Sequence, residues 1–428
     1  MQMNIRFLSK NKYLALLLIL FFTQQAFSVT TAELQDLYDQ KQYFDLRDKL
    51  REFQNDQSNE VIFFRGAIAN KFNSPQESIA LLNRFLKNAS PKDERLKDCY
   101  LLFADNYAKT FQYAKAAESY QTLLRKFSGE MDGKDKADYE NGFRLWNTLR
   151  KVRPQKVWFQ GDSRIQGVKA EVGLTVPVEI NRCPKEYLIF DTGANLSVVT
   201  ESLAKKLNLQ IIEARIDVGG ITGVKTRAKL AVAKKLKLGN VLAENVVFLV
   251  FPDKALYIEP ISYQMTGFIG FPLIAALREI TWVKNQKILI PAKPPSRTAQ
   301  NLALNNLTPL IEGHYQGKRL IFGFDTGASN TSFYQPFFKA FEDDVIRKGT
   351  QKPEKISGVG GSKEIKAYLM KDIKIYFAGK EATFPTVKVL TEKTTDLSQY
   401  VYGNIGRDLV DQFEKMTMNF QSMSVAFE

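Results

Sequence analysis

The chain has 428 residues, 44% of them hydrophobic and 25% charged, a composition typical of globular proteins with several apolar cores. One histidine and two cysteines exclude zinc sites built from four Cys and His ligands, and sites that need several histidines. Lysine and arginine outnumber the acids by 60 to 46, a net charge of +14, but the basic residues are spread along the chain and form no nucleic-acid motif.

The same counts narrow the possible chemistry. A Ser-His-Asp or Cys-His mechanism would have to use His314, the single histidine. We therefore expect no metal and no cofactor, and carboxylates remain as the abundant catalytic groups. We also expect no nucleic-acid partner.

Residues 1–28 have the features of a secretory signal peptide. Basic residues precede an apolar run from Leu14 to Phe22, and Ala26 and Ser28 are small residues at −3 and −1 of a cleavage point. The run is too short to cross roughly 30 Å of hydrocarbon. We expect an exported protein, periplasmic or secreted, that does not span the membrane once the signal is removed. An uncleaved anchor is the alternative.

Residues 29–150 show helical periodicity and a weak internal repeat. The segment from Ala67 to Leu82 is similar to the segment from Asn106 to Tyr120, at an offset near 39 residues. This pattern predicts a helical-repeat domain of tetratricopeptide type. Such a domain either binds a protein partner or only packs against the rest of the chain.

After the helical region, short β-branched and aromatic runs predict strands. Prolines and glycines punctuate two polar stretches, which we interpret as linkers. The expected division is a linker at 151–167, a first β block at 168–291, a second linker at 292–306 and a second β block at 307–428.

The two β blocks share three features in the same order. Each begins with an apolar strand that ends in Asp-Thr-Gly-Ala, at Asp191 and at Asp325. Each ends with a hydrophobic-Gly element, at Gly270 and at Gly406, so the spacing from aspartate to glycine is 79 and 81 residues. Between them lies a glycine-rich segment in each block, with Gly219 and Gly220 in the first and Gly358, Gly360 and Gly361 in the second.

This duplicated pattern resembles the retropepsin-like aspartic peptidases, and the arrangement looks like bacterial exported proteins of the aspartyl protease family. The resemblance covers roughly residues 165–428. It implies two homologous lobes whose Asp-Thr-Gly loops face each other across a cleft. The fold class expected is therefore an N-terminal all-α helical-repeat region followed by a bilobal all-β aspartic-peptidase domain.

The resemblance also implies roles for the motif residues. Asp191 and Asp325 would share one proton and activate a water that hydrolyses a peptide bond, with a peptide or protein as substrate. Thr192 and Thr326 would bond across the lobe interface, and Gly193 and Gly327 would allow the tight turns. The glycine-rich segments are candidate flaps.

Two positions differ from the family pattern. Ala194 and Ala328 stand where pepsin-like members carry a hydroxyl, so one hydrogen bond to each carboxylate is missing and we expect a less acidic optimum than pepsin's. Asn404 stands where an apolar residue usually precedes the Ile-Gly pair. This departure leaves open a non-catalytic scaffold with degenerate peptide-binding lobes. A third alternative pairs each lobe with its counterpart in a second chain, but the linker of about 15 residues favours pairing within one chain.

The cysteines are Cys99 and Cys183. An oxidising compartment would permit a disulfide between them, but they fall in different predicted domains, which disfavours it.

Overall fold

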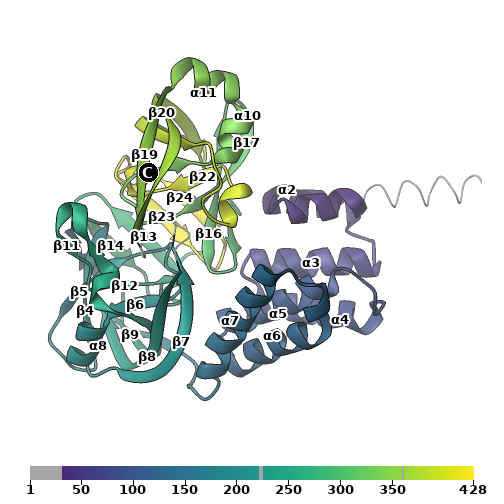
Figure 1. Ribbon diagram of the computed structural model, residues 1–428, viewed down its shortest axis with the longest axis horizontal. Helices are drawn as coiled ribbons and strands as arrows, with labels where there is room; N and C mark the ends of the chain where they lie inside the picture. Colours follow the sequence, from purple (N-terminus) through teal and green to yellow (C-terminus); the bar gives the residue numbers. More distant parts are fainter. Residues whose placement is uncertain (1–30, 221–224, 359–360) are drawn as a thin grey trace, which may run out of the picture.

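The computed structural model describes residues 31–220, 225–358 and 361–428 (Figure 1). A helical region at residues 31–149 precedes a large all-β region with two main sheets. This is the order of α and bilobal β parts that the sequence predicts. The expected signal peptide and Gly360 lie outside the described residues.

The helices begin at residues suited to cap them. The Ser58 side chain accepts a hydrogen bond from the Val61 N–H at 3.4 Å, and the Asp132 side chain accepts one from the Asp135 N–H at 2.7 Å. Pro75 is the first residue of its helix, where a missing N–H costs nothing. The helices are residues 31–39, α2 (Tyr43–Leu50), α3 (Asn59–Lys71), α4 (Pro75–Asn88), α5 (Leu96–Lys109), α6 (Tyr113–Phe127) and α7 (Gly133–Leu149), with 3-10 turns η1 (Arg51–Phe53) and η2 (Ser128–Glu130).

The first β block forms a sheet in the order β1-β9-β6-β12-β5-β4-β8-β7, with β3 paired to β4. Short helices follow β6 and β12, and a small hairpin lies outside the sheet. The elements are β1 (Lys156–Phe159), β3 (Val168–Lys169), β4 (Leu174–Ile180), β5 (Glu186–Phe190), β6 (Ser197–Thr200), α8 (Glu201–Lys206), β7 (Gln210–Gly219), β8 (Lys225–Leu238), β9 (Val241–Phe251), η3 (Asp253–Leu256), β10 (Tyr257–Ile258), η4 (Glu259–Ile261), β11 (Tyr263–Gln264), β12 (Gly267–Ile269) and α9 (Phe271–Ala276).

The second β block repeats the central strands of the first in the order β15-β16-β17-β22-β18-β21-β20-β19. In both sheets the strand that leads to Asp-Thr-Gly pairs in parallel with the strand before the later glycine, β5 with β12 and β17 with β22. The elements are β15 (Leu302–Asn305), β16 (Thr308–Tyr315), β17 (Lys318–Phe324), β18 (Ser332–Phe333), α10 (Gln335–Ala340), α11 (Glu342–Lys348), β19 (Thr350–Gly358), β20 (Gly361–Phe377), β21 (Lys380–Leu390), η5 (Leu397–Gln399), β22 (Gly403–Ile405) and α12 (Arg407–Val410).

A third sheet joins the two blocks. Its order is β2-β14-β13-β23-β24, with β2 (Ser163–Gln166), β13 (Glu279–Val283) and β14 (Lys287–Ile290) from the first block, and β23 (Lys415–Asn419) and β24 (Ser424–Phe427) from the second. The Trp282 ring in β13 packs edge-on against Phe190 and Phe324, with centroid distances of 6.2 and 6.0 Å. One aromatic side chain therefore supports both strands that end at an aspartate.

The segments expected to be linkers contain strands. Stretch 151–167 holds β1, which pairs with β9, and β2, which pairs with β14. Stretch 292–306 holds β15, paired with β16. Ile165 is buried in the core that the two lobes share, and this burial accounts for the position of β2 in the shared sheet.

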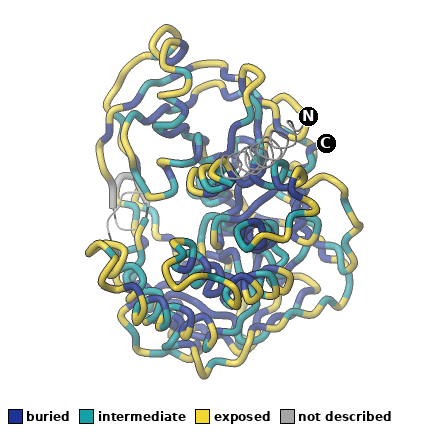
Figure 2. The backbone as a smooth tube through the Cα atoms, turned by 90° about the vertical axis from the view of Figure 1, so that its right-hand side faces the viewer, coloured by how far each residue is buried: buried dark blue, intermediate teal, exposed yellow. Residues whose placement is uncertain are grey.

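The helical region packs against both lobes, and buried segments run through the interior of the molecule (Figure 2). Successive side chains along β5 point to opposite faces of the sheet, so one strand contacts both the shared core of the lobes and the helices. Leu188 and Phe190 face the core shared by the two lobes, whereas Ile189 faces an apolar cluster that includes Tyr113 and Trp146 of the helices. On β17, Ile321 likewise belongs to a cluster with helical residues.

Candidate active site

The structure brings Asp191 and Asp325 together at the ends of two equivalent strands. Asp191 follows β5, and its backbone N–H donates to the carbonyl of Ile269 at 3.0 Å. Asp325 follows β17, and its N–H donates to the carbonyl of Ile405, also at 3.0 Å. Each aspartate is thus held by the parallel strand that precedes Gly270 or Gly406.

Each carboxyl group is oriented by the backbone of its own turn. Asp191 Oδ1 accepts from the N–H groups of Gly193 at 2.8 Å and Ala194 at 3.2 Å. Asp325 Oδ1 accepts from the equivalent groups of Gly327 at 2.9 Å and Ala328 at 3.2 Å. The carboxyl group of each aspartate lies against the glycine of the opposite turn, so the two groups are close neighbours. Asp191 and Asp325 are both intermediate in burial.

The threonines connect the two turns by four hydrogen bonds. The Thr192 hydroxyl accepts from the Thr326 N–H at 3.0 Å and donates to the Phe324 carbonyl at 3.0 Å. The Thr326 hydroxyl accepts from the Thr192 N–H at 3.1 Å and donates to the Phe190 carbonyl at 2.7 Å. Both threonines are buried, so these bonds fix the distance between the two turns with little competition from water.

Gly193 and Gly327 allow the carboxyl groups to approach across the interface. A Cβ on Gly193 would lie 2.5 Å from the Asp325 Cγ, and a Cβ on Gly327 would lie 2.5 Å from the Asp191 Cγ. Each glycine therefore makes room for the aspartate of the other lobe.

The electrostatics of the pair follow from this closeness. Burial and the adjacent negative charge of Asp325 raise the pKa of Asp191 well above its ordinary value. The backbone N–H groups of Gly193 and Ala194 act in the opposite direction. The pair can therefore hold one proton and one negative charge at a pH where two isolated aspartates would both be charged.

Two hydroxyl residues that sequence analysis missed support the later glycines. Ser197 Oγ accepts from the Gly270 N–H at 3.0 Å, and Thr331 Oγ1 accepts from the Gly406 N–H at 3.1 Å. The Thr331 hydroxyl also donates to Asp408 at 2.6 Å. Both hydroxyl residues come six positions after the aspartate of their lobe. Aligning the two copies of the motif in the sequence would therefore have identified them.

The candidate flap residues lie on two long hairpins. Gly219 ends β7 and is paired with Lys225 at the start of β8, and Gly220 follows it. Gly358 and Gly361 are paired where β19 and β20 meet. Among the described residues, no atom lies within 4 Å of a Cβ built on Gly219, so their packing does not require a glycine there.

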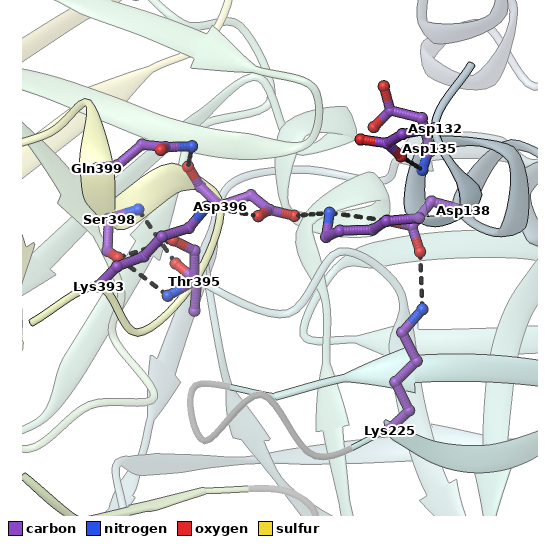
Figure 3. Close-up of polar contacts among 10 residues, drawn as sticks. Asp132, Asp135, Asp138, Lys225, Lys393, Thr395, Asp396, Ser398 and Gln399 are labelled. Carbon is purple, nitrogen blue, oxygen red and sulfur yellow. Dashed lines mark hydrogen bonds and ion pairs between the residues drawn. The ribbon is translucent and has the colours of Figure 1, made fainter.

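Helix α7 binds the β7–β8 hairpin. The Asn141 side chain donates to the Asp217 carbonyl at 2.8 Å and accepts from the Asp217 N–H at 2.9 Å, as a neighbouring strand would. A chain of ion pairs continues from Lys225 to Asp138 at 2.7 Å, from Asp138 to Lys134 at 3.1 Å, and from Lys134 to Asp396 at 2.6 Å (Figure 3). Helix α7 thus contacts a hairpin of the first lobe and a loop of the second.

Other groups named in the sequence analysis lie elsewhere. His314 is on β16, with its Nε2 3.7 Å from Glu312. Cys99 and Cys183 are both free thiols. Among the described residues, no group of three or more His, Cys, Asp or Glu side chains is placed to hold a metal ion. Within the same residues, no helix is long and apolar enough to cross a membrane.

Comparison with known families supports a protease in the first β block. A family model described as aspartyl protease matches residues 176–273. The match includes Asp191 and Gly270, and Asp325 lies outside it. No curated protein matches the chain. The first lobe is therefore similar to aspartyl proteases, whose substrates are peptides.

Proposed function

We propose that this protein is an exported aspartic endopeptidase that hydrolyses peptide bonds at the Asp191/Asp325 pair. The observation that carries the proposal is the meeting of two Asp-Thr-Gly turns, crosslinked by the hydroxyls of Thr192 and Thr326. Export rests on the signal-like composition of residues 1–28.

The geometry suits a water as nucleophile. One carboxylate of a pair that shares a proton can take a proton from water, while the protonated partner gives its own to the carbonyl oxygen of the substrate. The turn N–H groups and the cross-lobe bonds hold both oxygen pairs in place before substrate arrives, which removes the cost of ordering them during the reaction.

We further assign the two lobes to a tandem retropepsin-like arrangement with its site inside one chain. The matched strand order around Asp191 and Asp325 and the shared sheet support this assignment. The helix pairs α3–α4 and α5–α6 are assigned to the tetratricopeptide type. An extended peptide is the expected substrate, since sheet-lined grooves commonly bind peptides as an added strand.

The test is cleavage of a mixed peptide library between pH 3 and pH 8 by protein lacking residues 1–28. We expect cleavage, its inhibition by a pepstatin-type compound, and its loss in both Asp191→Asn and Asp325→Asn. Asp372→Asn is the matched control, because Asp372 is exposed and has a left-handed φ of 52° that asparagine also adopts. Peptide binding without cleavage at any pH would refute the peptidase and favour the scaffold.

A further inference from the structure

The two lobes differ at one pair of positions beside the carboxyl groups. In the first lobe Ile189 on β5 is in register with Phe268 on β12, and both are buried apolar residues. In the second lobe the corresponding residues are Gly323 on β17 and Asn404 on β22, again in register. A large apolar pair is therefore replaced by a glycine and an amide.

Gly323 provides the space that the Asn404 side chain occupies. A Cβ on Gly323 would lie 3.0 Å from Asn404 Oδ1. With its oxygen toward Gly323, the amide directs its Nδ2 to Asp325 Oδ2, at 3.2 Å. The opposite orientation would place the amide oxygen against a carboxyl oxygen, which is favourable only if that oxygen carries a proton.

This bond makes the two carboxyl groups unequal. Asp325 accepts from two backbone N–H groups and from Asn404, whereas Asp191 accepts from two backbone N–H groups. Among the described residues, Asn404 is the only residue whose side chain donates a hydrogen bond to the Asp191 or Asp325 carboxyl group. A donor that cannot lose its proton stabilises the ionised form of its acceptor.

We propose that Asn404 is a positioning residue that keeps the shared proton on Asp191 and the negative charge on Asp325. This inference rests on the proposed function, because it assigns roles within the same pair.

The assignment gives each carboxyl group one task in hydrolysis. Asp325 takes a proton from the water while the water oxygen bonds to the carbonyl carbon of the substrate. Asp191 gives its proton to the carbonyl oxygen, and the product of this step is a gem-diol. One hydroxyl of the gem-diol then returns a proton to Asp191. Asp325 passes its proton to the amide nitrogen, the C–N bond breaks, and an acid and an amine leave.

Other titratable groups on the surrounding elements have their own partners. The Tyr334 phenol is buried and its pKa is raised by burial and by Asp325, so it stays neutral. Arg407 pairs with Asp411, and Asp408 is bound by Thr331. Arg319 on β17 pairs with Asp45, Asp48 and Glu312, and Glu312 on β16 also lies 3.7 Å from His314. Glu186 on β5 pairs with Lys206, Glu179 on β4 pairs with Lys185, Lys318 lies over the rings of Phe341 and Tyr402, and Glu171 is exposed to solvent.

Labelling with an aryl epoxide tests the placement of charge without relying on peptide cleavage. A carboxylate oxygen opens the epoxide, a C–O ester bond forms, the ring C–O bond breaks, and the resulting alkoxide takes a proton from water. Because the ionised group reacts, we expect the ester on Asp325 in the parent protein, located by mass spectrometry of digested peptides. In Asn404→Leu we expect the label to divide between Asp191 and Asp325.

The pH profile of cleavage is the second readout. Without the Asn404 donor, the singly ionised pair is less stable relative to the fully protonated pair, so activity should fail at a higher pH on the acid side. For each protein, kcat/KM at the acid end of the profile is divided by its maximum value. We expect this ratio to be about tenfold lower in Asn404→Leu than in the parent, which corresponds to the loss of one hydrogen bond to a charged group. The alkaline side should move little, since Asp325 is charged on both sides of that transition.

Matched variants separate this role from packing. Asn83→Leu makes the same change at an exposed position of α4 and should alter neither readout. Asn404→Ser keeps a donor in a smaller side chain and should retain more of the parent labelling pattern than Asn404→Leu.

The outcomes distinguish the two proposals. An ester on Asp191 in the parent, or an unchanged label distribution in Asn404→Leu, overturns the role of Asn404. Cleavage with an unchanged acid side in Asn404→Leu also overturns it and leaves the peptidase standing. Selective labelling of Asp325 without any cleavage supports the placement of charge and refutes the peptidase.

Discussion

Gly327 shows how one missing side chain determines the site. Its Cβ position lies 2.5 Å from the carboxyl carbon of Asp191, so any other residue must displace an aspartate of the opposite lobe. We expect Gly327→Ala to lower kcat by at least about 100-fold, because a shift near 1 Å in a reacting group costs that much. Gly129→Ala is the control, since a Cβ there meets no atom within 4 Å in the part of the chain that the structure describes. Parent-like kcat in Gly327→Ala would contradict the described contact.

Asp191 also links stability to pH. Its folded pKa lies above the unfolded value, so the folded state holds a proton that the unfolded state releases as pH rises from about 4. The stability from this proton is present below the unfolded pKa and is lost as pH rises through the folded pKa.

Asp191→Asn should remove this dependence, because the amide is uncharged at every pH. We expect its melting temperature relative to the parent to rise as pH increases from about 4 toward neutrality. Melting curves of both proteins across this range are the measurement. A constant difference in melting temperature would show that Asp191 carries no raised pKa.

The sequence predicted which aspartates meet in the site, but it did not predict the contact that Asn404 makes with one of them. The duplicated motif predicted which side chains meet, because Asp191 to Gly270 and Asp325 to Gly406 repeat in order. The role of Asn404 was not readable, because it depends on its register with Gly323 on another strand. In the sequence alone Asn404 therefore looked like a loss of pattern.

At the scale of elements, α7 holds the outer strand of the β7–β8 hairpin. The ion pairs from Lys225 to Asp396 are largely exposed, and exposed pairs contribute little. The amide of Asn141 is the more directional contact, since it satisfies both backbone groups of Asp217.

We therefore expect Asn141→Ala to speed hydrogen exchange at the Asp217 N–H and to lower the free energy of unfolding by about 1–3 kcal/mol. Exchange followed by mass spectrometry and urea unfolding would measure the two effects. Asn147→Ala on the same helix should change neither. Protection of the Asp217 N–H that survives in Asn141→Ala would mean that another group covers it.

Short strands explain where the element predictions were incomplete. β2 alternates buried and exposed residues over only Ser163–Gln166, which is too short to separate from a polar linker. The partners of β2 and β13 are β14 and β23, so the shared sheet depends on contacts between distant segments. Such contacts leave no local period in the sequence.

At the scale of the molecule, the helices and lobes share apolar clusters. Phe63 and Phe64 of α3 belong to the same cluster as Ile321 of the second lobe, and Trp146 of α7 to the same cluster as Phe268 of the first. An interface of this kind resists independent motion of its parts. The helical region and the lobes are therefore expected to unfold together.

Two probes can follow the two parts. Circular dichroism at 222 nm reports the helices, and fluorescence reports Trp282 in a protein with Trp146→Phe and Trp158→Phe. We expect coincident urea transitions, and Ile321→Ala should lower both midpoints together through a loss of about 2–5 kcal/mol. Ile346→Ala, at an exposed position, is the control. Two separated transitions would show that the helices fold apart from the lobes.

The two lobes carry different residue pairs beside their aspartates, Ile189 and Phe268 in the first and Gly323 and Asn404 in the second. This difference breaks the symmetry between the lobes. Two identical half-sites related by a twofold axis would carry every substitution twice, so an amide could never favour one aspartate over the other. A chain that contains both copies is free to change one and keep the other. Because one chain carries both copies, its two aspartates can become chemically distinct, which identical subunits could achieve only by distortion of their symmetry.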